Sequence, residues 1–173
     1  MGSRPDRGVG QQVNQQGAQG GHAQPAAEIV DLVIRDARPS DAPQLATLMT
    51  QLGYPVSPVD VGQRVHRLQN IEEDRVVVAE TEGEIVGLAS LHTSLALEFD
   101  APAAKLSALV VHERHRRRGI GEALVMEMEA EARRRGRCLI YLTTAERRDD
   151  AHAFYRRVGF EETGRRFAKW LRD

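Results

Sequence analysis

The stretch Leu109-Val110-Val111-His112-Glu113-Arg114-His115-Arg116-Arg117-Arg118-Gly119-Ile120-Gly121 passes from aliphatic residues through a basic turn into a helical pattern. Glycines at the start of a helix let the backbone approach a ligand closely, and the first N–H groups of the helix favour an anion there. The side chains of Arg116, Arg117 and Arg118 can reach further phosphate oxygens. The stretch therefore predicts a strand, a phosphate-binding turn and a helix.

Competing interpretations of this turn stay open at the level of the residues. Short glycine patterns are common, so Gly119 and Gly121 could simply loosen a turn beside a solvated arginine face. A dinucleotide-binding fold is less favoured, because the chain lacks a Gly-x-Gly-x-x-Gly run and this strand is the fourth instead of the first. A P-loop is excluded, because Gly-Lys-Ser/Thr is missing.

The pattern on both sides of this stretch predicts one α/β domain, with a mixed central sheet flanked by helices in the order βααβββαβαβ. Apolar residues at helical spacing, such as Ile120, Leu124 and Met128, give the helix after the turn a buried face. We expect strands at residues 29–35, 75–80, 85–92, 106–111 and 138–143, helices between Ser40 and Gly53 and at 58–69, 119–135 and 150–158, and one or two closing strands within 160–171.

The first residues differ in composition from the rest of the chain. Residues 1–28 are rich in Gly, Gln and Pro, and Val9 and Val13 are their only large apolar residues after Met1. Such a segment buries too little apolar surface to offset the conformational entropy lost on ordering. We therefore expect a disordered tail over residues 1–28 and a single domain over residues 29–173.

Charge and cysteine content limit the partners and the compartment. The 24 Lys and Arg nearly cancel the 25 Asp and Glu, which gives no global attraction to nucleic acid or acidic lipid. No apolar run approaches the roughly 20 residues that cross a bilayer, so a membrane is not expected. The single cysteine, Cys138, points to a reducing compartment, for which the cytoplasm is the default, and its place within a strand predicts burial.

A second motif, Ala151-His152-Ala153-Phe154-Tyr155-Arg156-Arg157-Val158-Gly159-Phe160, predicts a helix closed by Gly159. Phe154, Tyr155 and Val158 share an apolar stripe, which is typical of ordinary core residues. Tyr155 differs from the others, because a buried hydroxyl needs a partner and can donate a proton where it faces a cavity.

These two motifs, in this order, resemble the GNAT N-acetyltransferases over roughly residues 30–171. The first family motif, Arg/Gln-x-x-Gly-x-Gly/Ala, is matched by Arg116, Gly119 and Gly121, and the second by Phe154-Tyr155 with Gly159-Phe160. The C-terminal third is also similar to aminoalkylphosphonate N-acetyltransferases, through Arg148-x-Asp150-Ala151-His152-x-Phe154-Tyr155 and Arg166-Phe167-x-Lys169-x-Leu171.

The resemblance implies acetyl-coenzyme A as the co-substrate, and the residues themselves predict no metal. It places the pantetheine arm along the fourth strand, at Leu109, Val110 and Val111, where a backbone N–H would stabilise the oxyanion. It assigns the pyrophosphate to the backbone amides of Arg116, Arg117, Arg118, Gly119, Ile120 and Gly121. The same resemblance makes Tyr155 the acid that protonates the departing thiolate.

The chain also departs from the family pattern. Many relatives carry a glutamate base on the fourth strand, whereas residues 105–108 read Lys-Leu-Ser-Ala. Another group or an ordered water must then accept the amine proton, and Glu98, Asp100 and His92 are the candidates, each with the alternative of a plain surface residue. Where many relatives have an asparagine before the last helix, this chain has Arg148.

The expected activity is transfer of an acetyl group to a primary amine of a small molecule by direct attack in a ternary complex. A protein N-terminal or lysine acetyltransferase is the alternative enzyme. A nucleic-acid-binding module using Arg114–Arg118 is disfavoured, because no aromatic residues are interleaved for base stacking. His112 and His115 lack the further ligands that a metal needs. Both a monomer and a homodimer are compatible with the sequence.

Overall fold

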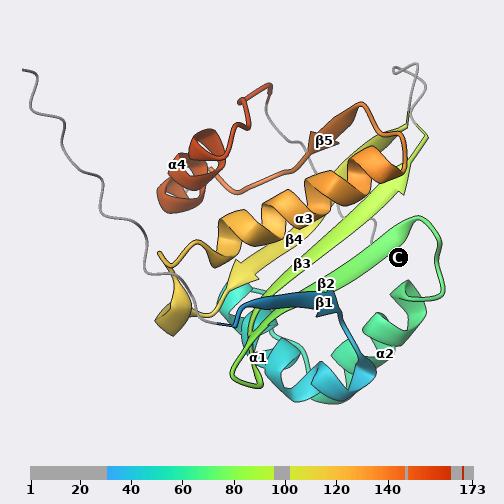
Figure 1. The fold of residues 1–173 in the computed structure, drawn as a ribbon, viewed down its shortest axis with the longest axis vertical. Helices are drawn as coiled ribbons and strands as arrows, with labels where there is room; N and C mark the ends of the chain where they lie inside the picture. Colours follow the sequence, from blue (N-terminus) through green and yellow to red (C-terminus); the bar gives the residue numbers. More distant parts are fainter. Residues whose placement is uncertain (1–30, 96–101, 147, 165–168, 170–173) are drawn as a thin grey trace, which may run out of the picture.

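The computed structural model describes residues 31–95, 102–146, 148–164 and 169. Its core is one five-stranded sheet with the strand order β1-β2-β3-β4-β5 (Figure 1). The strands are β1 (Val33–Asp36), β2 (Asp74–Thr81), β3 (Glu84–Ser94), β4 (Ala103–Val111) and β5 (Leu139–Tyr141). The helices are α1 (Ala42–Leu52), α2 (Pro58–Leu68), α3 (Ile120–Arg134) and α4 (Asp149–Arg157), with short 3-10 turns at Pro39–Asp41 and Glu113–His115.

The sheet is mixed, as the sequence predicts. Strands β1 to β4 pair antiparallel, while β4 and β5 pair parallel. A parallel pair needs a long crossover connection, and α3 supplies it between β4 and β5. The turn before α3 therefore begins at the carboxyl end of β4.

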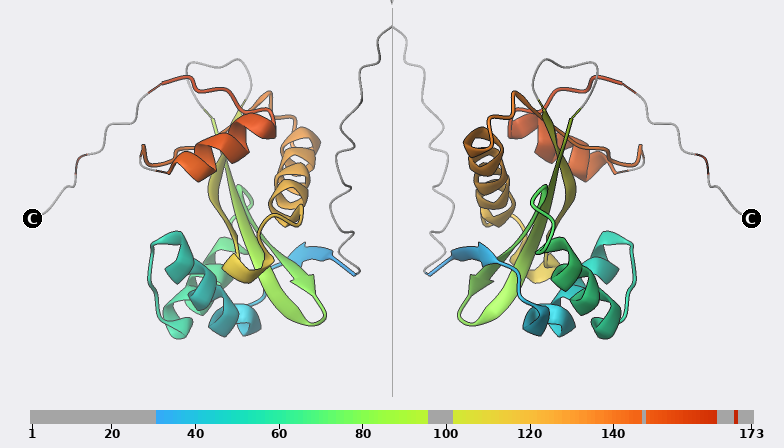
Figure 2. Two further views of the ribbon diagram at one scale, coloured as in Figure 1. Left: turned by 90° about the vertical axis from the view of Figure 1, so that its left-hand side faces the viewer. Right: turned by 90° about the vertical axis from the view of Figure 1, so that its right-hand side faces the viewer.

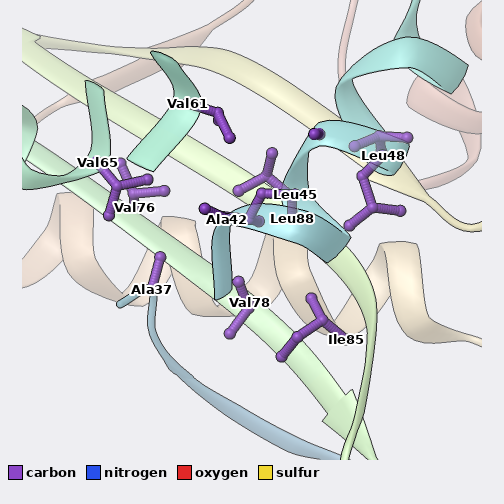
Figure 3. Packing of buried hydrophobic residues seen from close by; sticks show 12 residues of the cluster. Ala37, Ala42, Leu45, Leu48, Val61, Val65, Val76, Val78, Ile85 and Leu88 are labelled. Atoms are coloured by element: carbon purple, nitrogen blue, oxygen red, sulfur yellow. The ribbon is translucent and has the colours of Figure 1, made fainter. Parts of the chain in front are cut away.

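The helices form a layer on each face of the sheet (Figure 2). Helices α1 and α2 cover one face, where Leu45, Leu48 and Val65 pack against Val78 and Leu88 of the strands (Figure 3). Helix α3 covers the opposite face. Its Ile120, Leu124, Val125, Met128 and Ala132 pack there against residues that include Val77, Ala89, Leu91, Ala104 and Leu106. Which face a strand residue belongs to can thus be read from its core cluster.

Helix boundaries follow the capping residues. The Oγ of Ser57 accepts a hydrogen bond from the Asp60 N–H at 3.1 Å, so the predicted cap of α2 is confirmed. Gly53 ends α1 with a left-handed φ of 99°. The predicted cap at Ser40 is wrong, because Ser40 lies inside the 3-10 turn that precedes α1.

Strand boundaries differ more. Strand β4 begins at Ala103, earlier than predicted, and β5 covers only Leu139–Tyr141. Cys138 is exposed just before β5, so its predicted burial is wrong. Residues 160–164 and 169 are not in a strand, and the rest of the predicted closing strands, like residues 1–28, lies outside the described residues.

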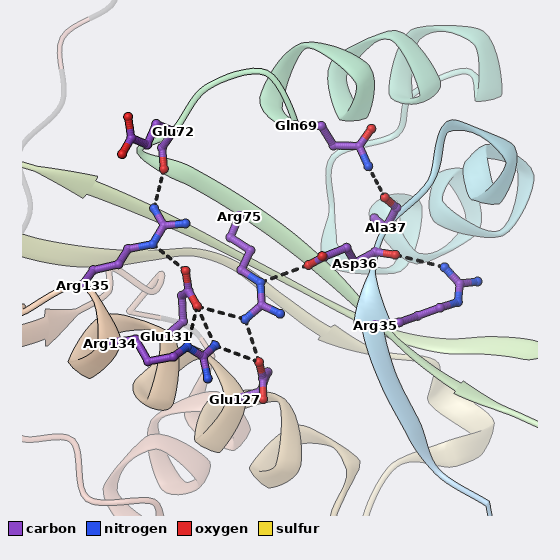
Figure 4. A network of polar contacts seen from close by, with 10 residues as sticks. All are labelled: Arg35, Asp36, Ala37, Gln69, Glu72, Arg75, Glu127, Glu131, Arg134 and Arg135. Carbon is purple, nitrogen blue, oxygen red and sulfur yellow. Dashed lines mark hydrogen bonds and ion pairs between the residues drawn. The ribbon is translucent and has the colours of Figure 1, made fainter.

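Charged residues join β1, β2 and α3 on one side of the molecule (Figure 4). The Arg75 guanidinium lies 3.0 Å from an Asp36 oxygen, 2.6 Å from Glu127 and 3.3 Å from Glu131. These contacts span the edge of the sheet and the helix above it. No helix among the described residues has the length and apolar character that crossing a membrane requires.

Candidate functional site

Strand β4 has a bulge at its middle, and its edge toward β5 is paired over only its first three residues. Ala108 pairs with Ser90 of β3 and Leu106 pairs with Leu91, so Ser107 is an extra residue in the register. On its other edge β4 pairs with β5 only through Ala103–Lys105. Beyond the bulge, β4 continues to Val111 while the pairing with β5 has already ended.

The backbone groups on this open edge can be assigned from the ladder. The His112 N–H donates to the Val86 carbonyl oxygen at 2.8 Å, so His112 faces β3. Because successive residues of an antiparallel strand alternate in direction, Val110 also faces β3, whereas the N–H groups of Leu109 and Val111 face the open edge. Part of the edge is already in use, since the Val111 carbonyl oxygen accepts from the Arg116 Nε at 3.1 Å.

These directions separate the three strand residues that the sequence singles out. Leu109 and Val111 present backbone donors toward the opening. Val110 does not, because its backbone faces β3 and its side chain is buried with the α1 and α2 cluster. Val110 therefore has no backbone N–H on the open edge with which to contact a pantetheine arm.

The turn after β4 has the backbone conformation of an anion site. Arg117 and Gly119 adopt left-handed φ angles of 61° and 85°, and α3 starts at Ile120. Left-handed residues in a turn aim successive N–H groups into one concavity, and the helix dipole adds partial positive charge there. The side chains of Arg116, Arg117 and Arg118 are exposed, whereas the Ile120 side chain is buried in the core.

Contacts from other elements hold this turn in place. The Glu113 N–H donates to the Gln51 side-chain oxygen of α1 at 3.0 Å, a contact that sequence reasoning missed. A Cβ added at Gly121 would lie 3.3 Å from the Phe154 ring of α4. Gly121 therefore permits close packing of α4 on the start of α3, in addition to any approach by a ligand.

Tyr155 lies beside this contact on α4. Its ring packs edge-to-face on Phe154 and on Phe160, with centroid separations of 5.3 and 5.7 Å. Burial raises the pKa of Tyr155, and the nearby Arg148 charge acts in the opposite direction. The phenol is therefore protonated at neutral pH and available as a proton donor.

A cavity of about 930 Å³ adjoins Tyr155. Its walls come from β5, from α4, from the residues that follow each of them and from Glu129 of α3, and they include Tyr141, Leu142, His152 and Phe160. No residue of β4 or of the turn lines it. Tyr155 thus borders this cavity, while its neighbour Phe154 contacts the turn.

The candidates for a proton acceptor have different outcomes. Glu98 and Asp100 lie outside the described residues. His92 lies on β3, with its Nδ1 at 2.9 Å from an Asp74 carboxylate oxygen. Asp74 was not expected from the sequence, because only the strand register brings it beside His92.

The two histidines of the turn, His112 and His115, contact each other and a neighbouring carboxylate. His115 Nε2 is 3.8 Å from a Glu84 oxygen, and the two histidines of the turn contact each other edge-to-face. No group of three or more metal-ligating side chains is found in the described part of the chain.

Comparisons with known proteins agree with this architecture. A sequence model of the acetyltransferase (GNAT) family matches residues 44–160. An aminoalkylphosphonate N-acetyltransferase from Salmonella typhimurium is 39% identical over 89 residues, which cover 51% of this chain and 58% of that protein. The human N-acetyltransferase 8 is 36% identical over 101 residues, covering 55% of this chain and 42% of that protein. The chain thus spans about half the length of the curated relatives that it matches.

Solved structures share the fold over a larger part of the chain. A Trypanosoma brucei acetyltransferase superposes with a TM-score of 0.69 at 25% identity, covering 82% of this chain and 100% of that one. The family match covers more than half of the sequence and includes the bulged strand, the turn and α4. The chain belongs to the acetyltransferase (GNAT) family.

Proposed function

We propose that this protein transfers the acetyl group of acetyl-coenzyme A to a primary amine of a small molecule. The observation that carries the proposal is the continuity between the open edge of β4 and the turn before α3. Backbone donors at Leu109 and Val111 lead directly to a concavity of amides at a helix N-terminus. An extended ligand with an amide-containing arm and a pyrophosphate fits these backbone donors, with the arm along β4 and the pyrophosphate at the turn.

The residues suit such a ligand part by part. The N–H groups of Leu109 and Val111 would hydrogen bond the pantetheine arm as an added strand would. The amides from Arg116 to Gly121 would hold the pyrophosphate, with the exposed arginine side chains adding charge. When bound, acetyl-coenzyme A supplies an activated thioester.

The chain then contributes to two charges that develop during transfer. A neutral amine forms a C–N bond at the thioester carbonyl, and a β4 N–H on the open edge would stabilise the negative oxygen. The C–S bond breaks as the adduct collapses, and Tyr155 would give its proton to the sulfur. Tyr155 recovers a proton from the nitrogen, which becomes an amide.

Sequence similarity supports a small-molecule acceptor. The relative from Salmonella typhimurium is named for aminoalkylphosphonates, and the matched segments are 39% identical. We therefore propose aminoalkylphosphonates as the first acceptors to examine. Peptides with a free N-terminus or a lysine represent the alternative acceptor class.

The test measures release of free thiol from acetyl-coenzyme A with a panel of amines. Aminoalkylphosphonates, aminoglycosides, polyamines, amino acids and peptides form its arms, and mass spectrometry identifies the acetylated product. We expect turnover with at least one small amine. Turnover with peptides alone would replace the small-molecule assignment, and no thiol release with any amine would contradict acetyl transfer.

A further inference from the structure

We infer that His92, held by Asp74, is the proton acceptor for the attacking amine. This inference rests on the proposed acetyl transfer and assigns the one group that the reaction still lacks. An amine is mostly an ammonium at neutral pH, and an ammonium has no lone pair with which to attack the thioester. A group near the β4 bulge must therefore take one proton from it.

The register places His92 near that bulge. His92 of β3 pairs with Lys105 of β4 and with Asp74 of β2. Its neighbour Leu91 packs with the α3 cluster, so alternation puts the His92 side chain on the opposite face of the sheet. Asp74 lies on that face as well, because Val76, two residues further along β2, packs with α1 and α2. Lys105 lies there too, because its neighbours Ala104 and Leu106 pack with the α3 cluster.

The distance along the strand suits transfer through water. Ser90 lies opposite Ala108, next to the bulge at Ser107, and on the same face as His92. Two residues of a β-strand span about 7 Å, which an imidazole and one ordered water can cover. His92 thus stands within reach of an amine placed over the bulge.

The contact with Asp74 leaves the correct nitrogen available. Asp74 Oδ1 lies 2.9 Å from His92 Nδ1, and the Asp74 side chain is only 9% exposed, against 45% for His92. A carboxylate that accepts from Nδ1–H fixes the tautomer in which Nε2 carries a lone pair. The Nε2 of the half-exposed His92 side chain can then accept a proton, while the Asp74 carboxylate lies at the other nitrogen of the ring.

Neighbouring charged groups do not offer the same chemistry. Lys105 flanks His92 on β4, but an ammonium cannot accept a proton. Asp74 on β2 is already bonded to Nδ1 and points its charge at the imidazole. Among the described residues at this register, His92 is therefore the group with a usable lone pair.

The proton balance closes with the two assigned groups. His92 takes one proton from the ammonium through water and later releases it to solvent. The resulting amine forms the C–N bond, and the C–S bond breaks. The second nitrogen proton replaces the one that Tyr155 gives to the sulfur, so the net products are the amide, free coenzyme A and one proton.

The test compares His92→Gln with the parent in the thiol-release assay, as kcat/KM for the amine between about pH 6 and pH 9. We expect a loss of about a hundredfold or more at neutral pH, the usual size of a general-base contribution. The loss should shrink as the pH rises, because more of the amine is then neutral without help. Acetyl-coenzyme A affinity should stay unchanged.

Two further variants keep the test decisive. Asp74→Asn retains the size of the side chain, but its NH₂ group can donate to Nδ1 and leave Nε2 protonated, so a similar loss with the same pH trend is expected. His66→Gln, on the exposed side of α2, is the matched control and should match the parent. Asp74→Asn also carries the test if His92→Gln lowers the melting temperature by several degrees.

Failure of this inference differs from failure of the proposed function. A parent that releases no thiol with any amine would overturn both. An active parent whose His92→Gln and Asp74→Asn variants stay within twofold of it across the pH range would overturn the role of His92 alone.

Discussion

At the scale of single residues, Tyr155 has two roles that its surroundings allow. Its ring packs between Phe154 and Phe160, as a core residue would. Burial also raises the pKa of its hydroxyl, while Arg148 opposes that shift. A raised pKa keeps the phenol protonated below about pH 10, so the group can act as an acid throughout the physiological range.

Tyr155→Phe separates these roles, because it removes the hydroxyl and keeps the ring. An acid role predicts a fall in kcat of about 10²- to 10⁴-fold with acetyl-coenzyme A affinity retained. A purely structural role predicts nearly unchanged turnover. Tyr141→Phe, which removes a hydroxyl from the same cavity wall, serves as the control and should retain activity. Turnover of the Tyr155 variant within twofold of the parent, at saturating substrates, would remove Tyr155 from the mechanism.

Gly119 is the residue whose conformation matters most in the turn. Its φ is 85°, and a Cβ placed there would meet no atom within 4 Å. Gly136, after α3, has a φ of 68° and equally open surroundings. The two glycines therefore differ in location and not in local strain.

We expect Gly119→Ala and Gly136→Ala to destabilise the protein alike, by about 1–2 kcal/mol, the cost of a left-handed residue with a side chain. Only Gly119→Ala should weaken the binding of acetyl-coenzyme A, because strain at this position shifts the amides that would hold the pyrophosphate. Denaturant unfolding and calorimetric titration of the two variants measure these effects. Equal affinities in the two variants would argue against the turn as the anion site.

At the level of helices and strands, the sequence predicts those features that depend on residues close together in the chain. The cap at Ser57 and the left-handed Gly53 define helix ends, and the apolar face of α3 is buried as expected. The start of β4 could not be predicted, because small residues at Ala103 and Ala104 do not distinguish a strand from a connection. The length of β5 could not be predicted either, because it is limited by its pairing with only three residues of the distant strand β4.

The site shows the same division between local and distant information. The turn at Gly119 is visible in a few consecutive residues. The contact between Asp74 and His92 and the packing of Phe154 on Gly121 depend on strand register and helix placement. No local pattern carries that information.

Helix α2 offers a direct test of one local signal. Ser57→Ala removes the acceptor for the Asp60 N–H and should lower the free energy of unfolding by about 1 kcal/mol. Ser57→Gly should lower the free energy of unfolding by only about a few tenths of a kcal/mol, since glycine is tolerated at this position. Denaturant titrations of both variants measure these losses, and an unchanged free energy of unfolding in Ser57→Ala would mean that the hydroxyl contributes nothing.

At the scale of the whole molecule, ion pairs connect the layers and make stability depend on pH. Burial raises the pKa of Asp41, but hydrogen bonds from Arg35 and from the Arg38 backbone outweigh it and hold the pKa below the ordinary 3.8. A hydrogen bond from Arg75 similarly lowers the pKa of Glu127 below 4.5. Burial opposes but does not cancel the lowering of the Glu131 pKa by its arginine partners, Arg134 first among them.

These lowered pKa values fix the direction of the pH dependence. In the window between the folded and unfolded pKa values, the unfolded chain binds more protons, so stability rises with pH. The contribution is present above the unfolded values, near 3.8 and 4.5, and is lost as the pH falls through the folded ones.

We expect the melting temperature to fall on acidification below about pH 4.5. Glu131→Gln should be less stable at neutral pH but should lose less on acidification, because one linked proton is absent. The exposed Glu146→Gln is the control and should follow the parent. Parallel curves for the parent and Glu131→Gln would show that this carboxylate is not linked to folding.

In the proposed binding mode, acetyl-coenzyme A lies along the open edge of β4 and across the turn that follows. Residue-resolved amide hydrogen exchange, with and without acetyl-coenzyme A, locates the bound ligand on these backbone groups. We predict that the amides of Leu109, Val111 and Gly119 gain protection, while Val110, which already faces β3, changes little. Unchanged exchange at Leu109 and Val111 under saturating acetyl-coenzyme A would contradict this binding mode.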